Sequence, residues 1–290
     1  MVALTPASPP SLHKRELAEH SARKGSCAVL ASQRNRGDWH AMMTLPMWIR
    51  LGPLALHPHW VFETLAYTLA GYVYDRDRRR RGDVVETRIR WWVIGAAAFG
   101  GLVGSRLLYL VENPAELMRH WAEPAYLAGG KTIVGGLIGG LIAVEWIKRR
   151  LGVTVATGDL LVMPLVLGIA VGRIGCFLSG LADRTYGVAT ALPWGVDFGD
   201  GIARHPTQLY EIAFLAVLAV VLVVLIPRSL VAGDRFKWFM IAYLMFRFAI
   251  DFIKPAVRIG GLSTIQWAAL AAIAYYAPHV PRLLAEVRRG

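Results

Sequence analysis

The chain has 290 residues, 55% of them hydrophobic, and a mean hydropathy of +0.43. This composition excludes an ordinary soluble domain and is typical of a polytopic membrane protein. The formal net charge of +12 could indicate a nucleic-acid-binding protein, but the positive residues flank apolar runs, so we expect membrane lipid and no nucleic acid as partner.

Residues 1–42 differ from the rest of the chain. They are polar, mixed in charge and without helical periodicity, so we expect a disordered tail. No apolar run precedes Cys27, which excludes a lipoprotein signal peptide. The tail could also be an artefact of an upstream start codon, with Met43 or Met47 as the alternative start. We expect residues 43–290 to form one transmembrane domain.

Seven apolar runs follow the tail and predict an all-α, polytopic integral membrane protein with seven transmembrane helices. A helix needs about 20 residues to cross about 30 Å of hydrocarbon, and several runs are shorter. The first run could begin earlier, near Leu51, and the third could be a true span or a partly re-entrant element. The runs are roughly Trp60–Tyr74, Trp91–Val111, Thr132–Ile147, Thr157–Ser179, Leu209–Ile226, Phe236–Ile253 and Leu262–Ala277.

The loops between these runs differ in positive charge. One set of loops, with the C-terminal tail, carries 16 Lys and Arg residues, and the other set carries 6. Cytoplasmic loops carry the excess of positive charge, so we expect the N-terminus outside and the C-terminus inside. The 7 positive residues of the first 50 oppose this orientation, which is a further reason to treat the tail separately.

Glycines recur four residues apart in several runs. This spacing lets helix backbones approach closely, so we expect these glycines to mark helix contacts. The pairs are Gly100 with Gly104, Gly135 with Gly139, Gly136 with Gly140, and Gly168 with Gly172.

Polar side chains gather at one depth of the predicted bundle. Arg106, Arg173 and Arg247 lie roughly 8–9 Å below the outer boundary, at 1.5 Å of rise per residue. A single arginine could extend to the interface, but three at one depth on three helices indicate a shared site. The other polar residues near this level are His57, His59, Glu63, His205, Gln208, Tyr210, Glu211 and Gln266.

A buried arginine in lipid needs an anionic partner, and guanidinium groups bind phosphate through planar, often bidentate hydrogen bonds. In the outer leaflet the expected phosphate is that of a phospholipid headgroup. The residues alone therefore predict a membrane protein that holds an anionic lipid, without a cofactor. Cys27 and Cys176 lie in different contexts and predict neither a disulfide framework nor a metal site.

The most specific motif of the chain is RHPTQLYE at residues 204–211. It occurs together with GRIG at 172–175, GGLIG at 135–139, Leu56-His57, Gly104-Ser-Arg106 and RFAIDF at 247–252. Taken together, these motifs resemble the prolipoprotein diacylglyceryl transferases, from about Leu51 to the C-terminus.

The resemblance implies a seven-span, multi-pass enzyme of the bacterial cell (inner) membrane. Such enzymes move the diacylglyceryl group of phosphatidylglycerol to the lipobox cysteine of an exported prolipoprotein, forming a thioether and glycerol phosphate. By position, Arg173 and Arg247 are expected to hold the phosphate. The same motifs imply a substrate-binding role for Arg106, Gly135, Gly136, Gly172, Gly180, Arg204, Gln208, Tyr210, Glu211 and Gln266.

The chain departs from the family pattern at chemically important positions. The family has His before the Gly-Gly-Leu block and Asn after Gly-Arg-x-Gly, and this chain has Val134 and Cys176 there. Leu181 stands where the family usually has Glu, and His59 where a Tyr is common. His59 or His205 could supply the missing base, whereas Cys176 is expected to be a small apolar filler rather than a nucleophile.

Two alternatives to this transferase remain open. A phospholipid-binding or lipid-transport membrane protein could keep the headgroup site and lose the chemistry. A transferase could also use a different acceptor.

Overall fold

The computed structural model describes residues 45–225 and 231–289, so the expected disordered tail lies outside the described residues. The described chain is mainly helical, with three short antiparallel hairpins. The hairpin strands are β1 (Ile49–Leu51) with β2 (Leu54–Leu56), β3 (Val196–Asp197) with β4 (Ala203–Arg204), and β5 (Arg258–Ile259) with β6 (Leu262–Ser263).

Each of the seven predicted apolar runs overlaps a helix, although Ile226 at the end of the fifth run lies outside the described residues and Leu262–Ser263 at the start of the seventh form strand β6. These helices are α2 (Pro58–Arg81), α3 (Thr87–Glu112), α6 (Ile133–Arg150), α7 (Val162–Leu178), α8 (Thr207–Val220), α9 (Asp234–Ile250) and α10 (Thr264–Tyr276). Short helices connect or extend them: α4 (Pro114–His120), α5 (Pro124–Ala128), α11 (Val280–Arg289), the 3-10 turns η2 (Asp159–Leu161), η3 (Gly180–Asp183), η5 (Asp251–Ile253) and η6 (Ala277–His279), and the π turn η4 (Val221–Leu225).

Side-chain caps fix where two of the helices begin. Thr132 Oγ1 accepts from the backbone N–H of Gly135 and so starts α6. At α10, Ser263 and Gln266 form a capping box in which each side chain bonds the other's backbone N–H. Because these caps satisfy otherwise unpaired N–H groups, both helix ends can be buried.

Three helices in the described part of the chain have the length and apolar composition to cross a membrane. They are Thr87–Glu112, Asp159–Leu178 and Thr207–Val224. The other four predicted spans are helical but shorter or more charged. For example, α9 has 17 residues and α10 has 13, while α2 ends in four consecutive arginines.

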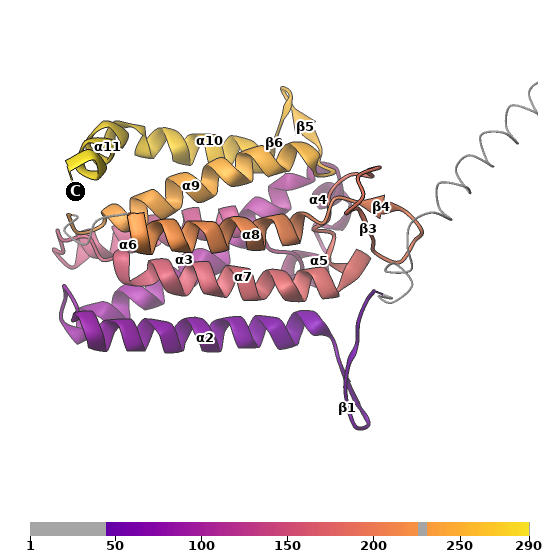
Figure 1. The fold of residues 1–290 in the computed structure, drawn as a ribbon, viewed down its shortest axis with the longest axis horizontal. Helices are drawn as coiled ribbons and strands as arrows, with labels where there is room; N and C mark the ends of the chain where they lie inside the picture. Colours follow the sequence, from indigo (N-terminus) through magenta and orange to yellow (C-terminus); the bar gives the residue numbers. More distant parts are fainter. Residues whose placement is uncertain (1–44, 226–230, 290) are drawn as a thin grey trace, which may run out of the picture.

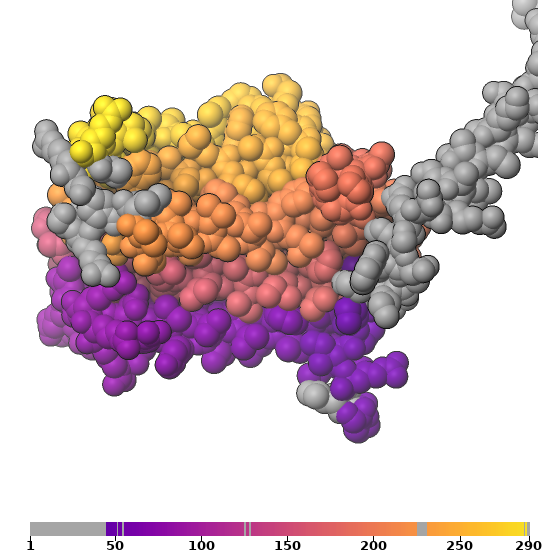
Figure 2. Space-filling view, in the orientation of Figure 1, coloured from indigo at the N-terminus to yellow at the C-terminus, as the bar shows by residue number. Residues whose placement is uncertain are grey.

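The long helices run along a common direction, with loops at two opposite ends (Figure 1). One end gathers the three hairpins with α4 and α5, and the other holds α11 and the C-terminus. On the face shown in Figure 2, α2, α7, α8, α9 and α10 succeed one another from indigo to yellow. Helix α3 packs mainly on α6 and α2 mainly on α7. We call the end with the hairpins the hairpin end.

Glycines allow the closest of these helix contacts. A Cβ atom on Gly104 would lie 2.3 Å from the carbonyl oxygen of Gly135, and one on Gly100 would lie 2.4 Å from that of Gly139. The predicted role of these glycines in close packing of α3 and α6 is therefore confirmed. Gly172 differs, because its Cβ would meet no described atom within 4 Å.

The apolar core lies between α7, α8, α9 and α10. Leu215, Phe239, Tyr243 and Leu244 are fully buried there. At the hairpin end this core gives way to polar side chains, which form the candidate site.

Candidate active site

A buried carboxylate lies between two arginines from neighbouring helices. Glu211 comes from the second turn of α8, Arg173 from α7 and Arg247 from α9, and the exposed fraction of each is 6% or less. Glu211 Oε2 lies 2.9 Å from Arg173 Nε and 3.4 Å from Arg247 Nη1. The structure therefore brings together three of the residues that the sequence places in the site, and we call them the arginine cluster.

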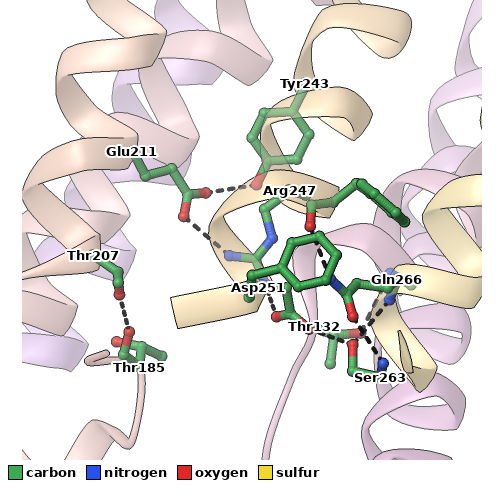
Figure 3. Close-up of polar contacts among 12 residues, drawn as sticks. Thr132, Thr185, Thr207, Glu211, Tyr243, Arg247, Asp251, Ser263 and Gln266 are labelled. Carbon is green, nitrogen blue, oxygen red and sulfur yellow. Dashed lines mark hydrogen bonds and ion pairs between the residues drawn. The ribbon is translucent and has the colours of Figure 1, made fainter. Parts of the chain in front are cut away.

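The carboxylate of Glu211 is also held from its other side. Tyr243 Oη donates to Glu211 Oε1 at 2.6 Å (Figure 3). Arg247 Nη2 lies 3.7 Å from Asp251 Oδ1, and Asp251 in turn accepts a hydrogen bond from the Ser263 hydroxyl. Glu211 and Asp251 thus hold the arginine side chains in place, but they do not accept from all of the guanidinium N–H groups.

Two of the guanidinium donors have no aligned hydrogen bond to any described residue. Arg247 Nε is buried and unbonded, and Arg173 Nε is close to Glu211 but not aligned to donate to it. A buried donor without a partner is expensive, so such groups indicate a place where a ligand completes the hydrogen bonding.

The RHPTQLYE block positions a loop as well as the cluster. Gln208 Nε2 donates to Thr185 Oγ1 at 3.0 Å, and the Thr207 hydroxyl donates to the carbonyl oxygen of Thr185. Thr185 Oγ1 in turn donates to Asp183 Oδ2 at 2.6 Å. The start of α8 therefore fixes the carboxylate of Asp183.

Asp183 belongs to a second polar group at the same end. His59 Nδ1, near the start of α2, lies 3.1 Å from Asp183 Oδ1. Cys176 completes the group, because ligand atoms of His59, Cys176 and Asp183 all lie within 4.8 Å of one another. Burial alone raises the pKa of Asp183, but hydrogen bonds from His59 and Thr185 outweigh it and lower the pKa to about 2. We call these three residues the His59–Cys176–Asp183 cluster.

The two clusters touch through α7. Arg173 Nη1 lies 3.9 Å from Cys176 Sγ, one helical turn further along. Cys176 therefore faces the polar site. A single chain segment carries both the arginine and the thiol.

Other predicted site residues lie at the same end without joining the arginine cluster. Arg106 Nη1 donates to the carbonyl oxygen of Gly130 at 2.6 Å. Arg204 pairs with Asp200 and lies over the ring of Tyr186. The contacts of Arg106 and Arg204 therefore stabilise the neighbouring loops.

Gln266 and His205 have contacts that suit structural roles. The side-chain amide of Gln266 caps α10 and donates to the carbonyl oxygen of Phe248 at 3.0 Å (Figure 3). His205 Nδ1 lies 3.2 Å from Tyr210 Oη, which also accepts from Trp194 Nε1. Tyr210 and His205 therefore form a polar group beside the β3–β4 hairpin.

The predicted glycines divide by their surroundings. Gly135 is packed against Gly104, and Gly136 has more space, since its Cβ would lie 3.5 Å from Gly101. Gly180 has a positive φ of 62°, and a Cβ there would lie 3.2 Å from the carbonyl oxygen of Phe198. Gly180 is thus required by the turn into η3, whereas Gly172 leaves space beside Arg173.

Sequence reasoning missed several residues of the site. Tyr243 lies one turn before Arg247 on the same helix face, a spacing that could have identified it. Asp183 lies in a polar loop with no such signal. Lys254 follows η5, and burial together with the charges of Arg247 and Arg173 lowers the pKa of Lys254 to about 7.

A cavity of about 490 Å³ lies between α2, α3, α6 and α7 and extends to Phe236 of α9 and Tyr276 of α10, toward the end opposite the hairpins. Its lining includes Tyr67, Gly136 and Leu137. Tyr67 donates to Glu63, which lies 3.5 Å from His59. A larger groove of about 850 Å³ runs along α3 and α6, and neither is lined by the arginine cluster.

Comparison with known proteins gives consistent matches over most of the chain. Residues 46–278 match the family model described as prolipoprotein diacylglyceryl transferase. A phosphatidylglycerol–prolipoprotein diacylglyceryl transferase of Bordetella avium is 33% identical over 248 residues, or 78% of this chain and 89% of that protein. Proteins of the same name from Geobacter sulfurreducens and Pseudomonas aeruginosa are 31% and 29% identical, and each match covers 75% of this chain and 85% or 84% of the relative.

Proposed function

Since this chain belongs to the prolipoprotein diacylglyceryl transferase family, we propose that it moves the diacylglyceryl group of phosphatidylglycerol to the cysteine thiol of an exported prolipoprotein. The observation that supports this most is the arginine cluster. Its two buried guanidinium groups are held by Glu211 and keep unused donors, as a phosphate site requires.

All seven long helices span the bacterial inner membrane in this proposal, with the hairpin end outside. The loops with 16 positive residues then lie in the cytoplasm. Helices α9 and α10 are short for a span, and their terminal turns η5 and η6 extend them toward the two interfaces. The arginine cluster lies at the level of the outer leaflet, where an exported acceptor can reach it.

Arg173 and Arg247 bind the phosphate of the lipid donor. During transfer the bond between the glycerol carbon and the phosphate oxygen breaks, and negative charge develops on the leaving glycerol phosphate. Fixed donors aimed at such a developing charge usually provide a large part of catalysis. Glu211 and Tyr243 contribute by holding both guanidinium groups in place before the lipid binds.

The acceptor thiol must lose its proton before it attacks. Val134 is buried and cannot act as a base. His59 is the better placed of the two candidate bases, because Asp183 orients its ring and Cys176 connects it to Arg173. His205 Nδ1 instead lies 3.2 Å from Tyr210 Oη, beside the β3–β4 hairpin.

The acyl chains of the donor occupy the apolar cavity between α2, α3, α6 and α7. Gly136 and Tyr67 line that cavity, and Tyr67 bonds Glu63. Gly172, with open space at its Cβ position, leaves room for the headgroup next to Arg173.

The test is transfer of labelled diacylglyceryl from phosphatidylglycerol to a lipobox peptide by membranes that contain this chain. We expect a thioether-linked lipid on the peptide cysteine and release of glycerol phosphate. A peptide with Ser in place of that Cys is the matched control and should remain unmodified. Phosphatidylglycerol binding without transfer to any thiol peptide would favour a lipid-binding protein, and transfer to thiols outside a lipobox would favour a different acceptor.

A further inference from the structure

The His59–Cys176–Asp183 cluster combines imidazole, thiol and carboxylate at one point, beside the phosphate site. These three side-chain types are the ligands that zinc-class divalent ions prefer in proteins. Their ligand atoms already lie within 4.8 Å of one another.

The distances fit a tetrahedral ion. Bonds of about 2.0–2.3 Å place neighbouring ligand atoms roughly 3.3–3.6 Å apart. His59 Nδ1 and Asp183 Oδ1 are 3.1 Å apart, so they need to separate only slightly. A side-chain shift of roughly 1 Å brings all three ligand atoms to bonding distance of one ion.

Helix packing holds these side chains together. The start of α2 lies on α7 at Gly175, where a Cβ would lie 2.7 Å from Phe62 Cβ and 3.5 Å from the Cα of His59. Because Gly175 precedes Cys176, the absence of a side chain brings His59 against the thiol. Asp183 closes the group from η3, at the end of the same segment.

Each ligand is oriented by a second residue through an atom that does not face the ion. His59 Nε2 lies 3.5 Å from Glu63 Oε2, a buried oxygen without a hydrogen bond to any described residue. Asp183 Oδ2 accepts from Thr185. An imidazole ligand that gives its other N–H to a carboxylate is the usual second layer of a zinc site.

Glu63 is itself fixed, so it can serve in this way. Lys131 and Tyr67 both bond Glu63 Oε1, which leaves Oε2 for the imidazole. On the thiol side, Arg173 Nη1 lies 3.9 Å from the sulfur.

We propose that the His59–Cys176–Asp183 cluster binds one zinc-class divalent ion, whose fourth position takes the acceptor cysteine as a thiolate. This inference rests on the proposed function for the identity of the acceptor. Three protein ligands and one open position are the arrangement of catalytic rather than structural zinc sites. The side chain of His59 is 30% exposed, so an incoming polypeptide can reach the ion.

With the ion bound, His59 is a ligand rather than the base, and the ion itself promotes deprotonation of the acceptor thiol. A free thiol has a pKa of about 8.5, and coordination to such an ion deprotonates it. The proton passes to water, and the thiolate sulfur forms a bond to the terminal glycerol carbon of the lipid. The carbon–oxygen bond to phosphate breaks with its electron pair, and glycerol phosphate leaves against Arg173 and Arg247.

The first experiment measures the metal content of the purified full-length chain after exchange into metal-free buffer. We expect about one equivalent of zinc, as for a single three-ligand site. Replacing zinc with cobalt(II) should give a thiolate-to-cobalt charge-transfer absorption in the near ultraviolet, which reports Cys176 without any variant. A chain with no zinc, and with no such absorption after cobalt is added, overturns the proposal.

Variants then locate the site. His59→Ala, Cys176→Ser and Asp183→Asn should each lose most of the zinc, and Glu63→Gln should weaken its affinity about 10- to 100-fold. The matched control is His120→Ala, since His120 lies between two carboxylates, Glu116 and Glu123, at the same end of the molecule. Zinc retained in all three ligand variants, or lost equally in His120→Ala, contradicts the assignment.

Failure of the metal site and failure of the transferase are distinguishable. If the metal-free chain transfers the lipid and a chelator does not inhibit it, the transferase activity is supported and the metal site is excluded. If the chain binds one zinc at these three residues but does not transfer lipid to the lipobox peptide, the metal site is supported and the prolipoprotein cysteine is excluded as its fourth ligand. Alkylation of Cys176 by iodoacetamide at equal rates with and without chelator would instead indicate a free thiol and overturn the ion.

Discussion

Buried arginines occur at both ends of the helix bundle, and their surroundings differ. Near the end opposite the hairpins, Arg90 is fully buried, and all three of its guanidinium nitrogens donate hydrogen bonds. Nε and Nη2 bond Asp83, and Nη1 bonds the carbonyl oxygen of Thr157. At the hairpin end, Arg173 and Arg247 share one oxygen of Glu211, and the Nε of each has no aligned partner among the described residues.

The difference separates a structural arginine from one that is available to a ligand. Burial is similar in the two regions, so burial alone does not identify a binding site. Arg90 joins α3 to the loop before α7, and each of its three guanidinium nitrogens already bonds the protein. The unused donors of Arg173 and Arg247 are the feature that points to an anionic ligand.

The largest expected effect is that of replacing Arg90, which tests whether this arginine is structural. Arg90→Ala leaves Asp83 without its main partner, and loss of one member of a buried ion pair lowers the free energy of unfolding by about 3–5 kcal/mol. Thermal unfolding in detergent measures the change, and Arg79→Ala at the exposed Asp75 pair is the control. A normal unfolding midpoint in Arg90→Ala would show that the network is not structural.

The second prediction concerns transfer by the arginine-cluster variants. Arg173→Ala and Arg247→Ala should lose about 1.5–3 kcal/mol of phosphate stabilisation, or about tenfold to 150-fold in rate. The loss is greater if the contact strengthens in the transition state. Lys variants should rescue poorly, because an ammonium lacks the planar pair of donors. Initial rates with labelled phosphatidylglycerol provide the measurement, and rates equal to wild type in both Ala variants would exclude the phosphate role.

The long helices and the gathering of polar residues at one end of the bundle could be predicted from the sequence, whereas the partners of these residues could not. Each of the seven apolar runs corresponds to a helix in the described part of the chain, and a rise of 1.5 Å per residue predicts one level for Arg106, Arg173 and Arg247. The rotation of a helix about its axis depends on packing, and this is why Arg106 bonds Gly130 instead of joining the other two. The place of Asp183 in the site could not be predicted, because the path of a polar loop has no sequence periodicity.

Tyr243 offers a smaller test of how the cluster is held. Tyr243→Phe removes the hydrogen bond to Glu211 Oε1 but keeps the ring and the apolar packing. A hydrogen bond to a charged group contributes about 1.5 kcal/mol or somewhat more, so transfer should fall about tenfold while the fold remains intact. Tyr276→Phe, another buried tyrosine outside the cluster, is the control and should transfer at the wild-type rate. Unchanged transfer in Tyr243→Phe would show that Glu211 is fixed by the arginines alone.

The smallest expected effect is a pH dependence from Lys254. This residue lies close to Arg247, Arg173, Glu211 and Asp251, and its pKa is lowered to about 7. Because an anion favours the protonated amine, phosphatidylglycerol affinity should rise by up to about tenfold as the pH falls from 8 to 6. Lys254→Met should bind with much less dependence on pH over this range. If the affinity of Lys254→Met changed with pH as much as that of the wild type, the titrating group would be a different residue.

The most direct test of the central claim is the dissociation constant for phosphatidylglycerol, measured with purified wild type, Arg173→Ala and Arg247→Ala. Arg119→Ala is the control, because this arginine is exposed on α4 at the same end and pairs with Glu116. The account predicts a dissociation constant at least about tenfold higher in each cluster variant, measured at a temperature at which that variant is folded, with Arg119→Ala equal to wild type. Wild-type affinity in both cluster variants would contradict the claim that these two arginines hold the lipid phosphate.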